Sequence, residues 1–155
     1  MKTYTVSLFG HRNIANKSEI ENRLDKLLHD ILTNNDHVRF LIGHDGEFDL
    51  LAASAIRRAI NSRGTGSASL ILVLPYMRSE YYERGSLLLS DYDDIKICRE
   101  SSKVHFKSAF HVRNRKMVDC SDLVICCIQR SSGGAYTAVQ YARNQNCKII
   151  NLGNH

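Results

Sequence analysis

The stretch that decides the fold is DLVICCIQRSSGGAYTAVQYA, residues 122–142. Residues 122–128 form a nearly continuous apolar run, which is typical of a strand buried on both faces of a parallel sheet. The glycines Gly133 and Gly134 then mark a tight turn, and residues 134–144 have the pattern of a helix. A buried strand that leads through a glycine turn into a helix predicts crossover units and a parallel sheet.

Strand and helix patterns alternate along the rest of the chain. Ser18 and Glu21 have the S-x-x-E spacing of a capping box, and apolar residues at spacings of three and four follow them. Residues 76–103 are the least clear and predict a short helix and a small strand. The chain therefore predicts an α/β fold: a single Rossmann-like domain over residues 1–155, with a mostly parallel sheet and helices on both faces. The expected strands are residues 4–9, 38–42, 69–74, 95–98, 122–128 and 147–152, and the expected helices are residues 18–32, 48–62, 107–120 and 134–144.

The composition is that of an ordinary globular domain, with 155 residues of which 43% are hydrophobic. The apolar runs are too short to cross a bilayer and no secretory leader precedes the first strand, so we expect a cytoplasmic protein without membrane contact. The five cysteines form no CxxC pair and the seven histidines show no metal-ligand spacing. We therefore expect reduced thiols, no metal site and no cofactor. The formal charge of +5 is compatible with a phosphate-bearing partner.

Ligands of parallel sheets bind where the strands end, and four predicted loops reach that edge. The loop at residues 129–134 is the strongest candidate, because glycines allow close backbone approach and a helix start attracts phosphate. There Gly133 and Gly134 are expected to approach a phosphate, with hydroxyl groups from Ser132 and Thr137. The alternative is a plain tight turn with a serine cap. The other three loops are residues 10–12, 43–49 and 75–78.

The loop after the first strand carries Gly10, His11 and Arg12. Arg12 can make a two-pronged contact with a phosphate or carboxylate. His11 can donate to ligand oxygens or act as an acid or base. The alternative is a turn with a solvated arginine and a histidine that caps the helix.

The loop after the second strand opens with Gly43 and carries three acidic residues, Asp45, Glu47 and Asp49. Carboxylates there can hold ribose hydroxyls or steady an oxocarbenium-like centre in glycosidic chemistry. The alternative is that their negative charge stabilises the helix start, an interpretation that we favour for Asp45 and Glu47 and less so for Asp49.

A basic run, residues 113–116, lies on the helix marked by Phe110 and contains Asn114 and Arg115. Arg115 follows Phe110 by five residues, roughly 140° around the helix, so it need not face the core. It can then reach a ligand phosphate. An ordinary solvated basic face is the alternative.

Taken in order, these segments resemble one family, the YpsA-like proteins of the SLOG superfamily, which also contains the DNA-processing protein DprA and the LOG phosphoribohydrolases. The resemblance implies a Rossmann-like fold, a pocket for a nucleotide or nucleotide-derived ligand, and self-association as a homo-oligomer. The matching segments are residues 9–12, 48–53, 72–76, 113–122 and 132–142. The positions that the resemblance assigns to the pocket are Gly10, His11, Arg12, Asp49, Asn114, Arg115, Gly133, Gly134 and Thr137.

The chain departs from the pattern of its relatives at two places. LOG enzymes carry an acidic residue where this chain has Gln140, and a neutral amide cannot stabilise a ribosyl cation by charge. The glycine that the family places before Phe48 is replaced by Glu47, which would put a new carboxylate at the pocket rim. The remaining candidates for a catalytic role are Asp49, Glu47 and Arg115.

Three functions follow from these observations. The main prediction is a soluble module that binds a nucleotide or nucleotide derivative, as a sensor or sequestering protein. The alternative is a LOG-like hydrolase that cleaves the N-glycosidic bond of nucleoside monophosphates. The second alternative is DprA-like binding of single-stranded nucleic acid, although no basic groove with interleaved aromatic residues is visible in the sequence.

Overall fold

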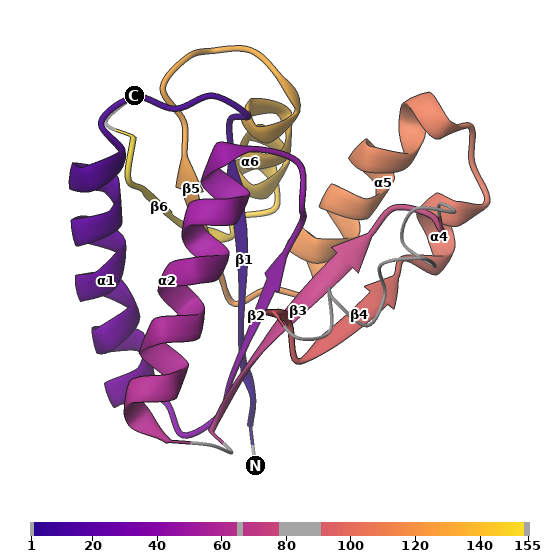
Figure 1. Ribbon diagram of the computed structural model, residues 1–155. Coiled ribbons are helices and arrows are strands. Elements are labelled where there is room, and N and C mark those ends of the chain that lie inside the picture. The colour runs from indigo at the N-terminus through magenta and orange to yellow at the C-terminus, as the bar shows by residue number, and fades with distance from the viewer. Residues whose placement is uncertain (1, 65–66, 78–90, 154–155) are drawn as a thin grey trace.

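The computed structural model describes residues 2–64, 67–77 and 91–153, and it shows six strands in one parallel sheet (Figure 1). The strand order is β4-β3-β2-β1-β5-β6, and every neighbouring pair is parallel. The strands are β1 (Tyr4–Gly10), β2 (Val38–Ile42), β3 (Ala68–Leu74), β4 (Asp94–Ile97), β5 (Leu123–Cys127) and β6 (Lys148–Asn151). The helices are α1 (Lys17–Asn34), α2 (Glu47–Arg63), α4 (Arg99–Ser102), α5 (Phe106–Asp119) and α6 (Gly134–Asn144). The predicted Rossmann-like α/β architecture is confirmed.

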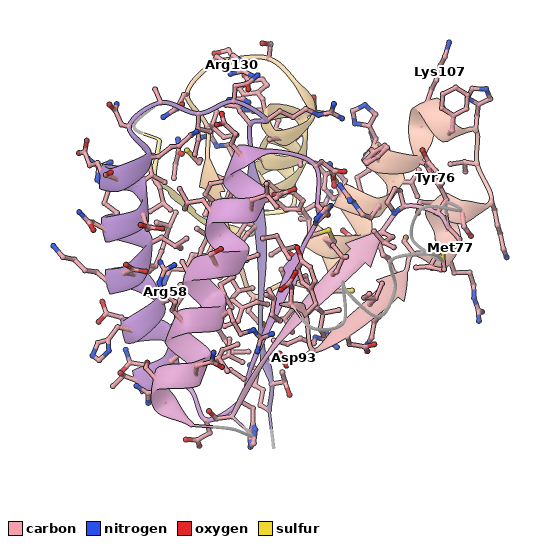
Figure 2. The ribbon with its side chains drawn as sticks, in the orientation of Figure 1. Arg58, Tyr76, Met77, Asp93, Lys107 and Arg130 are labelled. Atoms are coloured by element: carbon pink, nitrogen blue, oxygen red, sulfur yellow. The ribbon has the colours of Figure 1, made fainter. Side chains whose placement is uncertain are left out.

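Helices cover both faces of the sheet, as the apolar strand runs predicted. Helices α1 and α2 pack on one face, where alternate strand residues such as Leu8 and Phe40 join the larger core. Helices α5 and α6 pack on the other face, against strand residues that include Phe9 and Leu41. Within the layer formed by α1 and α2, Arg58 of α2 forms ion pairs with Glu21 and Asp25 of α1 (Figure 2).

The order in which strands are added to the sheet reverses at β1, and this reversal determines where the site lies. The chain runs from β1 through β2 and β3 to β4, and then returns to the other side of β1 as β5. Gly10 at the end of β1 is level with Cys127 at the end of β5. The loops that follow these two strands therefore leave side by side and diverge, which is where ligands of open parallel sheets bind.

The start of the first helix differs from the predicted capping box. The helix begins at Lys17, one residue before Ser18, and no side chain of the described residues caps it. Asn16 occupies the position before it with φ 61°, a left-handed conformation that asparagine tolerates, and its carbonyl accepts from the N–H of Ile20 at 3.0 Å. The backbone turn at Asn16 thus replaces the predicted serine cap.

The stretch 76–103 holds the small strand and short helix that were predicted, as β4 and α4, while residues 78–90 lie outside the described residues.

All five cysteines are free thiols. Over the described ranges, no helix is both long and apolar enough to cross a membrane.

Candidate functional site

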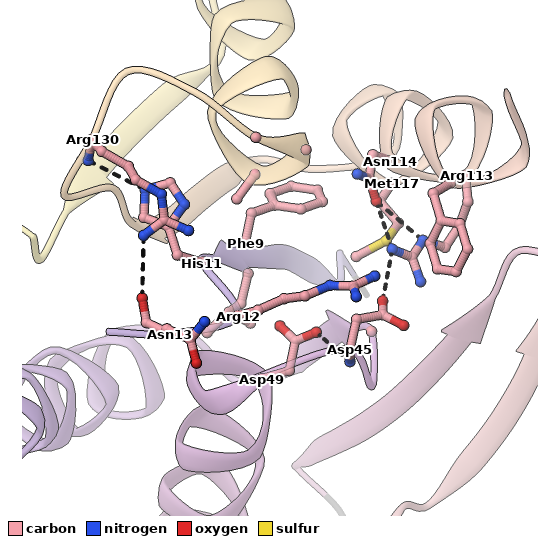
Figure 3. Close-up of a pocket in the computed structure, with 17 residues that line it drawn as sticks. Phe9, His11, Arg12, Asn13, Asp45, Asp49, Arg113, Asn114, Met117 and Arg130 are labelled. Atoms are coloured by element: carbon pink, nitrogen blue, oxygen red, sulfur yellow. Dashed lines mark hydrogen bonds and ion pairs between the residues drawn. The ribbon is translucent and has the colours of Figure 1, made fainter. Parts of the chain in front are cut away.

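A cavity of about 450 Å³ opens at the carboxyl edge of the sheet, between the ends of β1, β2 and β5 (Figure 3). Four segments form its walls: the loop after β1, the loop after β2 with the start of α2, one side of α5, and the loop after β5 with the start of α6. Three of the four loops expected at this edge therefore meet. The lining residues are Leu8, Phe9, Gly10, His11, Arg12, Asn13, Gly43, Asp45, Asp49, Phe110, Arg113, Asn114, Met117, Arg130, Gly133, Gly134 and Ala135.

The start of α6 is uncapped where it faces this cavity. Gly133 precedes the helix with φ +96°, a conformation that favours glycine, and no side chain in the described part of the chain caps the helix. The first helical bond runs from the Thr137 N–H to the Gly133 carbonyl at 3.1 Å. The N–H groups of Gly134 and Ala135 donate to no residue that the structure describes. Donors of this kind, with the positive end of the helix dipole, favour an anion.

Side chains tie the loop after β1 to the loop after β5. The Gln129 amide accepts from the Ala15 N–H and donates to the Ala15 carbonyl, both at 2.8 Å. The Arg130 guanidinium donates to the Asn13 carbonyl at 3.3 Å. Buried His11 accepts from the Arg130 N–H through Nε2 at 3.3 Å, so this nitrogen carries no proton in the structure. These bonds hold the two sides of the cavity at a set separation.

Arg12 combines a fixed backbone with an unengaged side chain. Its carbonyl accepts from the Glu47 N–H at 2.9 Å, and a Cβ on Gly46 would overlap the Arg12 backbone. The exposed side chain extends across the cavity toward Asp45 and Asp49 (Figure 3). Its guanidinium makes no hydrogen bond or ion pair within the described residues, so it can bind an incoming anion.

Arg113 is buried and fully engaged by the protein. Its guanidinium donates to the Val73 carbonyl at 3.1 Å and to Oδ1 of Asn114 at 2.9 and 3.1 Å, and pairs with Asp45 at 3.2 Å. A Cβ on Gly43 would lie 2.9 Å from this guanidinium, so the glycine makes room for the ion pair. The charge of Arg113 is thus balanced by Asp45, while Arg12 remains the less constrained cation.

Asp49 is 8% exposed and lines the cavity from the first turn of α2. Its Oδ2 accepts from the Asp45 N–H at 3.0 Å, which holds the preceding loop. Burial raises the pKa of Asp49 to about 7, against the lowering effects of that hydrogen bond and of Arg113 and Arg12. Asp49 can therefore gain or lose a proton near neutral pH.

Several residues predicted for the site lie elsewhere. Glu47 is not at the cavity rim, because it pairs with Lys17 and accepts from the Ile14 N–H at 3.1 Å. These two bonds lower the pKa of Glu47, and the bond from Lys17 has the larger effect. The Thr137 hydroxyl donates to the Gly133 carbonyl, and neither Thr137 nor Ser132 lines the cavity.

The arginine of α5 that lines the cavity is Arg113, whereas Arg115 is exposed and lies over the ring of Tyr141 at 5.5 Å. The reason is helix phase, because Arg113 shares a face with Phe110 and Met117 at spacings of three and four. That spacing is readable in the sequence and would have identified Arg113. Asn13 and Arg130, also absent from the prediction, had no such signal because they lie in loops.

Two predicted features fall outside the cavity. Of the loop at residues 75–78, Tyr76 contacts Phe110 edge-on, with ring centroids 6.1 Å apart, but does not line the cavity, and Arg78 lies outside the described residues. Gln140 does not line it either.

Within the described chain, no group of three or more His, Cys, Asp or Glu side chains is arranged to hold a metal ion.

Comparison with known proteins identifies the fold. No family model matches the chain, and neither does any curated protein. Among solved structures, the chain is similar to DNA processing protein A (DprA) from Streptococcus pneumoniae and from Helicobacter pylori, with a TM-score of 0.66 for each and identities of 15% and 16%. Both similarities cover 96% of this chain, which spans 50% and 64% of the two DprA chains. The fold is thus the DprA-like Rossmann-like fold expected from the SLOG resemblance, and the YpsA-like assignment remains a prediction.

Proposed function

We propose that the cavity binds the phosphate of a nucleotide or nucleotide-derived molecule, and that the protein acts as a sensor or sequestering module. The observation that carries this proposal is the uncapped start of α6, which opens into a cavity also reached by the unengaged guanidinium of Arg12. Backbone donors at a helix start together with an arginine are a well-suited pair for phosphate.

The rest of the cavity suits the remainder of a nucleotide. Phe9, Phe110 and Met117 form an apolar side that can receive the face of a base. Asp49 lines the opposite wall, and its Oδ1 accepts no hydrogen bond from the described residues, so it can accept one from a sugar hydroxyl. The volume of about 450 Å³ lies within the usual range for small-molecule pockets, roughly 300 to 1,000 Å³.

Calorimetric titration of the full chain with AMP, GMP, CMP, UMP and ADP-ribose tests the proposal, with adenosine as the control that lacks phosphate. We expect at least one phosphate-bearing compound to bind, and adenosine to bind about tenfold or more weakly than AMP. Binding should also raise the unfolding temperature of the protein, because the ligand stabilises only the folded state. A folded sample that binds none of these compounds would overturn the proposal.

Hydrolysis of the N-glycosidic bond is a second candidate, and Asp49 is the observation that favours it. A carboxyl group with a pKa of about 7 in a cavity can transfer a proton at neutral pH. Glu47 cannot share this role because its carboxylate is engaged outside the cavity. Chromatography of nucleoside monophosphates after incubation would show free base, and Asp49→Asn would abolish its release. If none of AMP, GMP, CMP and UMP releases free base, the protein does not hydrolyse these four nucleotides.

Binding of single-stranded DNA is a third candidate, favoured by the fold shared with DprA, since one of the two similar structures describes the single-stranded DNA binding mode of the Helicobacter pylori protein. The charge of +5 is compatible with such a partner. Fluorescence anisotropy with a labelled oligothymidylate tests it. Affinity that falls steeply with salt would support DNA binding, because each phosphate contact releases counterions.

A further inference from the structure

The side-chain amide of Asn114 has a fixed orientation. Two nitrogens of Arg113, Nε and Nη2, lie 3.1 and 2.9 Å from the same Asn114 atom. A guanidinium can only donate hydrogen bonds, so that atom must be the acceptor Oδ1. The Nδ2 amino group of Asn114 therefore points away from Arg113.

Arg113 cannot turn to release this orientation. It is buried between the Val73 carbonyl and the Asp45 carboxylate, and each of its three nitrogens donates to a protein acceptor. A rotation would leave a buried donor or the Asp45 charge without a partner, which is energetically unfavourable. The Asn114 amide is thus held in one of its two orientations.

The amino group of Asn114 faces the cavity without a partner. Asn114 is 6% exposed and lines the cavity, and its Nδ2 donates to no residue in the described ranges. Figure 3 shows the amide nitrogen on the side of α6. A buried donor in this position is costly to leave unpaired, so a ligand acceptor that reaches it is strongly favoured over a ligand donor.

We propose that Asn114 is a specificity-determining residue of the phosphate site, where its amino group donates to an anionic oxygen of the ligand. This inference rests on the function proposed above. Arg113 acts as a positioning residue, because the two hydrogen bonds that it donates to Oδ1 orient the amide and polarise it toward stronger donation. Arg113, whose charge is balanced by Asp45, thereby affects ligand binding through Asn114 without contacting the ligand itself.

Asn114→Asp provides the main test, because a carboxylate can still accept both bonds from Arg113 but offers no donor to the cavity. The matched control is Asn144→Asp, the same chemical change on the exposed last residue of α6, at the helix end away from the cavity. The probe is AMP, measured by calorimetry at two salt concentrations. We expect Asn114→Asp to bind about tenfold or more weakly at both, with an unfolding temperature no lower than that of the wild type.

The outcomes separate this inference from the proposed function. Wild-type protein that fails to bind AMP or any of the other nucleotides tested overturns both. Wild-type binding with equal affinities for Asn114→Asp and Asn144→Asp overturns the role of Asn114 alone. A loss that disappears at high salt indicates mere charge repulsion and also overturns it.

Nuclear magnetic resonance gives a direct readout that needs no charge change. In ¹⁵N-labelled protein, inorganic phosphate should shift the side-chain amide signals of Asn114, assigned by their loss in Asn114→Asp. Shifts at the Gly134 and Ala135 amides without one at Asn114 would contradict the inference and leave the phosphate site intact.

Arg113→Lys tests the positioning role, since lysine keeps a positive charge near Asp45 but cannot donate two parallel bonds to one oxygen. In a folded variant we expect the phosphate-induced shift at Asn114 to shrink and the AMP affinity to fall severalfold. An unchanged Asn114 response would remove Arg113 from the proposal.

Discussion

Two helices begin at the same cavity, α2 and α6, and their starts are built in opposite ways. The first turn of α2 carries Glu47 and Asp49, and the Glu47 N–H donates to the Arg12 carbonyl at 2.9 Å. The first turn of α6 has no acidic residue, and its leading N–H groups find no acceptor in the described chain. The protein satisfies one helix start with its own groups and leaves the other for an external anion.

The contrast extends to how each start is packed. Phe48 in the first turn of α2 is fully buried beneath the end of β1, and a Cβ on Gly10 would overlap its ring. At Gly134 of α6, a Cβ would meet no atom of the described residues within 4 Å. The start of α2 is therefore part of the core, whereas that of α6 borders open space, which suits a structural and a binding role respectively.

The largest effect is expected from Gly10→Val, because the added side chain must push Phe48 and the first turn of α2 away from β1. We expect a loss of about 3 kcal/mol in the free energy of unfolding, measured by urea denaturation. Gly134→Ala is the control and should change stability by less than about 1 kcal/mol. Equal losses in the two variants would erase the contrast in packing.

Asp49→Asn tests the charge that α2 keeps at its start. Since burial raises the folded-state pKa of Asp49 to about 7 from 3.8, folding takes up a proton between these values. Its contribution to stability is therefore present below about pH 4 and is lost as the pH rises toward 7, by an amount on the order of a few kcal/mol. Urea denaturation from pH 4.5 to 7.5 should show a smaller decline for Asp49→Asn than for the wild type. Parallel curves would show that Asp49 titrates alike in both states.

Arg12→Ala tests the cation that serves the start of α6. We expect the affinity for AMP to fall about tenfold, because a charge-assisted contact to phosphate is lost. Stability should stay within about 0.5 kcal/mol of the wild type, since the side chain is exposed and forms no bond within the described residues. The control is Lys148→Ala, which removes an equal charge at the amino end of β6, away from the cavity at the carboxyl ends of the strands. This variant should bind AMP with wild-type affinity. A similar loss in both variants would indicate only a net-charge effect.

The smallest effect is expected from Glu47→Gln, which removes the ion pair with Lys17. Both side chains are partly exposed, so the decrease in unfolding temperature should be below that of Gly10→Val. Because the pKa of Glu47 is lowered in the folded state, its contribution is present above its ordinary pKa and is lost as the pH falls. The difference from the wild type should therefore vanish in acid, and AMP affinity should not change. Weaker AMP binding would return Glu47 to the site.

Much of the site could be predicted because its groups directly follow strands. Gly10 and Gly43 stand at the ends of apolar runs, Gly133 lies in the loop after a third run, and parallel strands bring their ends to one edge. Arg115 illustrates what could not be predicted with the same rule, since a helix places residues by rotation as well as by position. The helical phase that Arg113 shares with Phe110 and Met117 turns Arg113 inward and leaves Arg115 exposed to solvent.

The alternation of apolar runs and helical patterns by itself determined the parallel sheet, the covering of both faces and the edge at which loops meet, because these follow from local periodicity and chain order. The tertiary structure alone decided which charged groups remain available at that edge. Asp45 and Arg113 neutralise each other, and Glu47 turns outward to Lys17, while Arg12 and the start of α6 have no partner among the residues that the structure describes. Such choices depend on distances of a few ångströms between residues far apart in the chain, and no local pattern encodes them.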